Sequence, residues 1–145
     1  MNYDLILGIT NIVLISTTPL VFAGIGELVT EKSGVLNLGL EGLMLVGAVS
    51  GFISLVITGN YFYSLILSIL SGAVLSSIFA FFVLRLLTNQ IATGLALTIF
   101  GIGLSAMLGK KFGGTPINGL SPYYLIIFSF ILVFLINYIP VSYTH

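Results

Sequence analysis

The stretch GELVTEKSGVLNLGLEG, residues 26 to 42, gathers three of the chain's four acidic residues, Glu27, Glu31 and Glu41, into a sequence that is otherwise apolar. A carboxylate near the middle of a membrane helix costs on the order of 3 kcal/mol, so such residues usually face a protein interior or a water-filled path. This stretch is therefore predicted to interrupt a series of membrane helices, and it is the first place to look for function.

The composition outside this stretch is that of an integral membrane protein. Of the 145 residues, 58% are apolar and only 6% are charged, and the mean hydropathy is +1.23, whereas soluble domains carry about 25% charged residues. The net charge is zero and no run of Lys or Arg occurs, which excludes a basic surface for nucleic acid. Without cysteine the chain has no disulfide or thiolate metal site, and we predict neither a metal site nor a catalytic residue.

Five apolar stretches are long enough to cross roughly 30 Å of hydrocarbon at 1.5 Å per residue, which predicts an all-α fold of about five membrane spans. Pro19 is expected to kink the first span rather than to end it. The aromatic cluster at residues 61–63 suits the headgroup level at the start of the third span. The predicted spans are residues 5–21, 38–57, 61–84, 91–108 and 123–139.

A broken or re-entrant element is predicted around residues 20–45. Five simple spans place Lys32 and Arg85 on one side and Lys110 and Lys111 on the other, so the positive-inside rule assigns no orientation. A break would change this count, and non-helical backbone at membrane depth is tolerated when protein buries it or when it lines a cavity. The flexible positions are Gly26, Gly34, Gly39 and Gly42.

Small residues recur at four-residue spacing in three of the predicted spans. This pattern lets neighbouring membrane helices approach closely, and we interpret it as helix packing and not as a binding site. The residues are Gly47 and Gly51 in the second span, Ser64, Ser68, Gly72 and Ser76 in the third, and Gly101 and Ser105 in the fourth.

Asn37 and Glu41 are four residues apart, a spacing that places them on one face of a helix. One interpretation puts both on a permeation path, where they exchange hydrogen bonds with a polar solute. The alternative makes Glu41 an anchor of the helix bundle that pairs with Lys32 or caps free backbone N–H groups. Asn89 and Gln90 leave a similar choice, since they either line the mouth of a path or satisfy the free N–H groups of a helix start.

Two stretches resemble the membrane permease subunits of bacterial ABC importers of the nucleoside and simple-sugar type, in the branched-chain amino acid and ribose permease superfamily. They read TPLVFAGIGELVTEKSGVLNLGLEGLMLVGA, residues 18–48, and NQIATGLAL, residues 89–97. The first follows the family pattern from Thr18 to Gly42, and a weaker similarity extends from Leu97 to Gly114. The resemblance thus covers most of the chain.

This resemblance implies a permease, not an enzyme, that moves nucleosides or simple sugars inward across the bacterial cytoplasmic membrane. It implies an identical or related second permease subunit, cytoplasmic ATPase subunits that use the ATP, and an extracytoplasmic solute-binding protein, with no cofactor on this chain. By motif, Asn37, Gly39, Glu41 and Gly42 are expected near a central broken helix. From the residues alone, a stand-alone channel or ion-coupled carrier and a purely structural membrane subunit stay open as alternatives.

The last five residues carry a separate prediction. Residues 141–145 read VSYTH, which is encoded by GTC TCT TAT ACA CAT, a reading frame of a common transposon sequencing adaptor. We interpret them as a non-native tail and residues 1–140 as the N-terminal part of a longer permease domain. Residues that couple the permease to its ATPase are then expected beyond residue 145.

Overall fold

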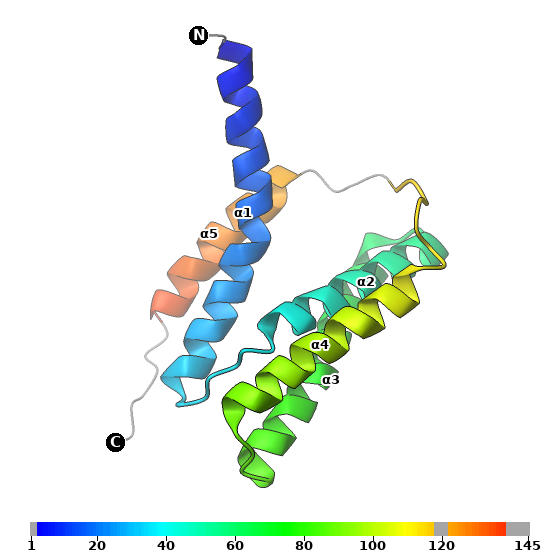
Figure 1. Cartoon of the computed structure of the whole chain (residues 1–145). Coiled ribbons are helices and arrows are strands. Elements are labelled where there is room, and N and C mark those ends of the chain that lie inside the picture. The colour runs from blue at the N-terminus through cyan, green and yellow to red at the C-terminus, as the bar shows by residue number, and fades with distance from the viewer. Residues whose placement is uncertain (1–2, 118–121, 139–145) are drawn as a thin grey trace. The chain divides into compact units, whose positions relative to one another are not determined.

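The computed structural model describes residues 3–117 and 122–138 (Figure 1). Within them, four helices are long and apolar enough to cross a membrane, and Tyr123–Leu135 is a shorter apolar helix. This confirms the predicted all-α membrane fold; the proposed tail at residues 141–145 lies outside the described residues. The elements are α1 (Tyr3–Lys32), α2 (Leu40–Thr58), α3 (Tyr61–Ala80), the π-helical turn η1 (Phe81–Arg85), α4 (Gln90–Gly109) and α5 (Pro122–Tyr138).

Helix α1 runs further than the predicted first span. It continues through Pro19, and the Thr18 hydroxyl donates to the Leu14 carbonyl one turn back at 2.8 Å. The helix ends where Gly34 adopts a left-handed φ of 83° and its N–H donates to the Glu31 carbonyl at 2.9 Å, a common way for a helix to stop at glycine. The interruption expected within residues 20–45 is therefore confined to residues 33–39.

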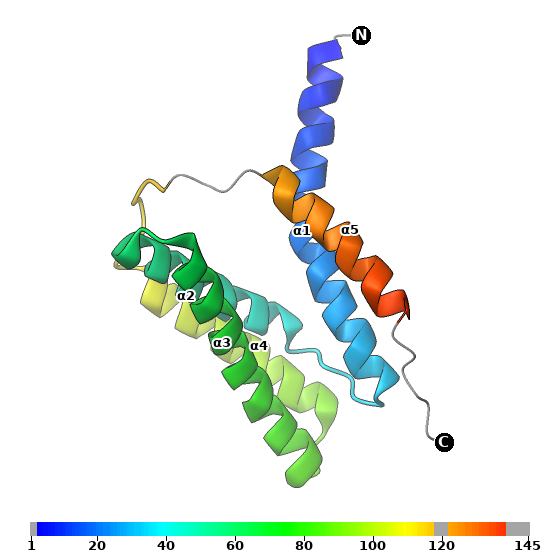
Figure 2. The same cartoon turned by 180° about the vertical axis from the view of Figure 1, so that it is seen from behind.

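The chain divides into two compact units, which are described separately. The first comprises Met1–Gly34 and Gly119–His145, and in it α1 and α5 lie side by side (Figure 2). The rings of Phe22 and Phe128 have centroids 5.9 Å apart, and the Tyr123 hydroxyl donates to Asn11 Oδ1 at 3.3 Å. Among its described residues, this unit is a helix pair that aromatic packing and a polar contact join.

The second unit, Val35–Asn118, is built around α2. Helix α2 packs against both α3 and α4, whereas α3 and α4 touch each other only slightly. The α2–α3 connection is short because Gly59 takes a left-handed φ of 65° and Asn60 Oδ1 then caps α3 by accepting from the Phe62 N–H at 2.8 Å. The buried apolar core of the unit is formed by Val46, Leu75, Phe79, Val83 and Leu97.

Small residues line the contact between α2 and α3. The Ser64 hydroxyl donates to the Gly51 carbonyl at 2.7 Å, and a Cβ added at Gly51 would lie 3.2 Å from Ser68 Cβ. A Cβ added at Gly47 would lie 3.4 Å from Ser68 Oγ, whereas one added at Gly72 would meet no atom within 4 Å. Four of the eight packing residues predicted from the sequence therefore meet at this contact. Ser76 and Ser105 are half-buried.

Candidate functional site at the start of α2

Residues 35–39, here called the break segment, are non-helical and lie against α4. The Leu36 N–H donates to Gln90 Oε1 at 2.8 Å, and the Thr98 hydroxyl donates to the Leu38 carbonyl at 2.9 Å. These two bonds supply partners that a helix would otherwise provide from its own backbone. Side chains of α4 thus hold the backbone that leads into α2.

Asn37 lies inside this break segment and not on a helix. It is only 5% exposed, and its Oδ1 accepts a hydrogen bond from the Gly39 N–H at 2.9 Å. An Asn side chain that bonds two residues ahead offers the backbone an alternative to the helix. Since α2 begins at Leu40, the expectation that Asn37 and Glu41 share a helix face is wrong.

Glycines bring the backbones of α2, the break segment and α4 into direct contact. A Cβ added at Gly101 would lie 2.5 Å from Gly42 Cα, and one added at Gly42 would lie 2.7 Å from the Leu97 carbonyl oxygen. A Cβ added at Gly94 would lie 2.9 Å from the Leu38 nitrogen. Real Cβ atoms do not approach backbone this closely, so α2 and α4 meet in a way that only glycine permits.

The other predicted pathway residues fall into distinct positions. Gly39 and Gly42 are buried, and a Cβ added at Gly39 would lie 2.8 Å from Leu97 Cδ2. Glu41 is exposed in the first turn of α2, where a negative charge interacts favourably with the helix dipole. Asn89 caps α4, because its Oδ1 accepts hydrogen bonds from the Ile91 N–H at 3.0 Å and the Ala92 N–H at 3.1 Å.

The structure therefore joins the two stretches on which the family resemblance rests. Leu36 of the first stretch bonds to Gln90 of the second, and a Cβ added at Gly39 or Gly42 would meet Leu97. Thr98 and Gly94 belong to the same contact but were absent from the predicted site. A signal for Gly94 was its place within NQIATGLAL, while Thr98 follows that stretch directly.

Apolar clefts also lie in the second unit, and two of them are bounded in part by α4. One, of about 510 Å³, is bounded by α3, η1 and α4, and Thr93 is the polar residue among its lining side chains. The other, of about 590 Å³, is bounded by α2, α3 and α4, and hydroxyls that line it, such as those of Ser50 and Thr58, donate to carbonyls of their own helix. Such surfaces suit hydrocarbon better than a solute that needs hydrogen bonds.

In the part of the chain that the structure describes, four apolar helices long enough to span a membrane, with a break segment bonded to α4 before one of them, define a multi-pass membrane protein. Residues 9–142 match the family model described as branched-chain amino acid transport system / permease component, and the chain belongs to this family. The resemblance found in the sequence is thereby confirmed.

Curated relatives share this similarity over most of the chain. Identity is 41% over 112 residues with a protein of Haloferax volcanii named as a glucose ABC transporter permease protein, covering 77% of this chain and 34% of that one. It is 33% over 105 residues with the nucleoside ABC transporter permease protein of Lactococcus lactis (68% and 33% covered), and 29% over 107 residues with the guanosine ABC transporter permease protein of Bacillus subtilis (70% and 34% covered). The chain spans about a third of the length of the curated relatives it matches. The comparison with solved structures finds no match.

Proposed function

We propose that this chain is part of the membrane-spanning permease of an ABC importer that carries a sugar or nucleoside inward across the cytoplasmic membrane. The observation that supports this most strongly is the family match over residues 9–142, together with three relatives named for glucose, nucleoside and guanosine transport. In this proposal separate ATPase subunits use the ATP, a second permease subunit completes the translocation unit, and a solute-binding protein delivers the solute from outside.

Glu41 is the residue proposed to contact the solute. Its side chain is exposed in the first turn of α2, beside the break segment. Sugars and nucleosides share hydroxyl groups, and an ionised carboxylate accepts hydrogen bonds from hydroxyls through two oxygens. In the same proposal Asn37, Gly39 and Gly42 shape the start of α2, and Asn89 and Gln90 fix the start of α4 beside it.

The test is uptake by the complete transporter. The full-length permease is reconstituted with its ATPase and binding protein in liposomes, and uptake of labelled glucose and guanosine is measured with and without ATP. We expect uptake that requires ATP, and a loss of roughly 10- to 100-fold in Glu41→Gln, since a hydrogen bond to a charged group contributes roughly 1.5–3 kcal/mol.

The matched control is Glu31→Gln, which removes an exposed carboxylate from α1 and should leave uptake unchanged. Solute flux driven by an ion gradient without ATP would contradict the importer and favour a stand-alone carrier. Equal uptake by Glu41→Gln and the unmodified protein would contradict the role of Glu41 alone.

A further inference from the structure

The hydrogen bonds from the break segment to α4 show how far the start of α2 is displaced along α4 from the start of α4. Leu36 bonds to Gln90, the first residue of α4, whereas Leu38 bonds to Thr98. The eight residues from Gln90 to Thr98 correspond to about 12 Å of helix at 1.5 Å per residue. Gly42 lies further along, against Gly101. The first residue of α2 therefore lies beside the middle of α4, about 12 Å along the α4 axis from the first residue of α4.

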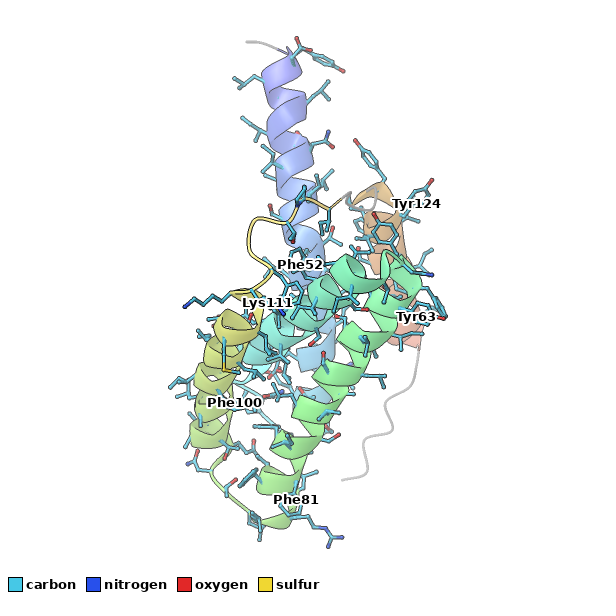
Figure 3. The ribbon with its side chains drawn as sticks, turned by 90° about the vertical axis from the view of Figure 1, so that its right-hand side faces the viewer. Phe52, Tyr63, Phe81, Phe100, Lys111 and Tyr124 are labelled. Atoms are coloured by element: carbon cyan, nitrogen blue, oxygen red, sulfur yellow. The ribbon has the colours of Figure 1, made fainter. Side chains whose placement is uncertain are left out.

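Helix α3 gives a second, independent measure of the same offset. Gly51 packs against Ser64 and Gly47 against Ser68, so α2 and α3 run antiparallel. Extending this register places the start of α2 near Leu75, ten residues before Arg85, which is roughly 15 Å along the helix. Figure 3 shows Tyr63 and Phe81 near opposite ends of the continuous α3–η1 helix. This helix therefore runs without a break from the aromatic cluster at residues 61–63 to Arg85.

Three backbone groups of the break segment are paired with side chains, as a position inside the membrane would favour. Lipid offers no hydrogen bonds, and an unsatisfied backbone group there costs several kcal/mol, so non-helical backbone must be satisfied by protein. The N–H groups of Leu36 and Gly39 bond to side-chain amides, and the Leu38 carbonyl accepts from a hydroxyl. Two of these three partners, Gln90 and Thr98, come from α4.

We propose that the break segment lies below the membrane surface and that Gln90 and Thr98 are positioning residues that hold it there. Glu41 then faces a water-filled recess that opens at the Arg85 end of the unit. The use of this recess by a solute rests on the proposed function, whereas the placement follows from the helix registers and the hydrogen bonds.

The first test measures water access at Glu41 by thiol labelling. The 145 residues contain no cysteine, so single cysteines report directly, provided that any cysteine elsewhere in the full-length permease is replaced. Glu41→Cys in membranes is treated with a small charged methanethiosulfonate and, separately, with a bulky polyethylene glycol maleimide. We expect reaction with the small reagent and none with the bulky one, because a bulky polymer does not reach a side chain about 12 Å below the start of α4.

Two control positions calibrate this labelling. In membrane fragments that expose both faces, Lys110→Cys, in the polar turn after α4, should react with both reagents, and Ile99→Cys, at a side chain 73% exposed on apolar α4, with neither. Reaction of Glu41→Cys with both reagents would place it at the surface and overturn the proposal. Reaction with neither would place it in apolar surroundings and overturn it equally.

The second test addresses the two positioning residues in the Glu41→Cys protein. Gln90→Leu and Thr98→Val each remove one bond, whereas Gln90→Glu keeps the acceptor and Thr98→Ser keeps the donor. We expect the first pair to change the labelling rate at residue 41 by about fivefold, the effect of one typical hydrogen bond, with the second pair close to the unmodified rate.

The Lys110→Cys labelling rate is measured in the same four backgrounds and should not change. A change at residue 110 as large as that at residue 41 would indicate general disruption and overturn the positioning role, as would equal behaviour of Gln90→Leu and Gln90→Glu. Labelling requires no transport, so a failure here is distinct from a failure of the uptake experiment.

Discussion

Helix α2 meets α3 and α4 through glycine in both cases, but the two contacts differ in what the glycine faces. At α3, a Cβ added at Gly51 would lie 3.2 Å from a serine side chain. At α4, a Cβ added at Gly101 would lie 2.5 Å from the Cα of Gly42. A side chain can shift by a few tenths of an ångström, whereas a helix backbone moves only with the whole helix. The α3 contact is therefore adjustable and the α4 contact is fixed.

The fixed contact lies next to the break segment, and this position has a physical consequence. A polar segment inside a membrane keeps its conformation only while its hydrogen-bond partners stay in place. Gln90 and Thr98 are carried by α4, and Gly42 and Gly101 hold α4 against α2. A rigid helix pair therefore supports the least regular part of the unit, as functional sites generally require.

The largest effect is expected from Gly101→Ala. The new methyl group would collide with the backbone of Gly42, and overpacking of this kind costs typically 1–3 kcal/mol and occasionally more. We expect most of the full-length permease to be lost from the folded fraction, measured by size-exclusion chromatography and thermal unfolding in detergent. The control is Gly103→Ala in the same helix, where an added Cβ meets no atom within 4 Å. Equal stability of the two variants would refute the fixed contact.

An intermediate effect is expected from Gly94→Ala. The added Cβ would lie 2.9 Å from the Leu38 nitrogen and 3.0 Å from the Gly39 nitrogen, so it pushes on the break segment and not on the α2 helix. We expect a loss of about 1–2 kcal/mol in unfolding free energy and a fall in uptake per folded molecule. If uptake per folded molecule is unchanged, the conformation of the break segment does not matter for transport.

A smaller effect is expected from Gly51→Ala at the adjustable contact. The nearest atom is Ser68 Cβ, followed by the Ser64 carbonyl oxygen at 3.4 Å. A shift of a few tenths of an ångström accommodates the methyl group, so the loss of unfolding free energy should stay below about 1 kcal/mol. The same thermal unfolding assay measures it, and a loss as large as that in Gly101→Ala would remove the distinction between the two contacts.

The membrane helices themselves were predictable because apolar length identifies them. The fourth span, for example, is predicted at residues 91–108 and observed at Gln90–Gly109. The end of α1 was less predictable, because Glu27 and Glu31 interrupt the apolar run without interrupting the helix. The intrahelical hydrogen bonds continue past both carboxylates, and only the left-handed φ of Gly34 ends them.

The contact between α2 and α4 was not predictable in the same way. Packing was predicted for Gly101, but its partner Gly42 depends on the register of two helices that are distant in sequence. The amides of Asn89 and Gln90 illustrate the same limit. Either side chain could bond to its own helix or to another segment. In the structure Asn89 accepts a hydrogen bond from α4, whereas Gln90 accepts one from the Leu36 N–H. Spacing in a sequence fixes a residue's face only where the chain is helical, whereas its partner follows from tertiary packing.

The smallest effect is expected from Gly72→Ala, which tests the packing stripe of α3 where the second unit offers it no neighbour. Gly72 keeps the four-residue spacing, yet an added Cβ meets no atom within 4 Å. Glycine inside a helix is less favourable than alanine by roughly 0.5–1 kcal/mol, so the isolated permease should be unchanged or slightly more stable in thermal unfolding. A loss of stability there would mean that another helix of the permease covers this face. If the isolated permease is unchanged but the complete transporter assembles less well, the face at Gly72 contacts another subunit, and this part of the stripe then serves assembly.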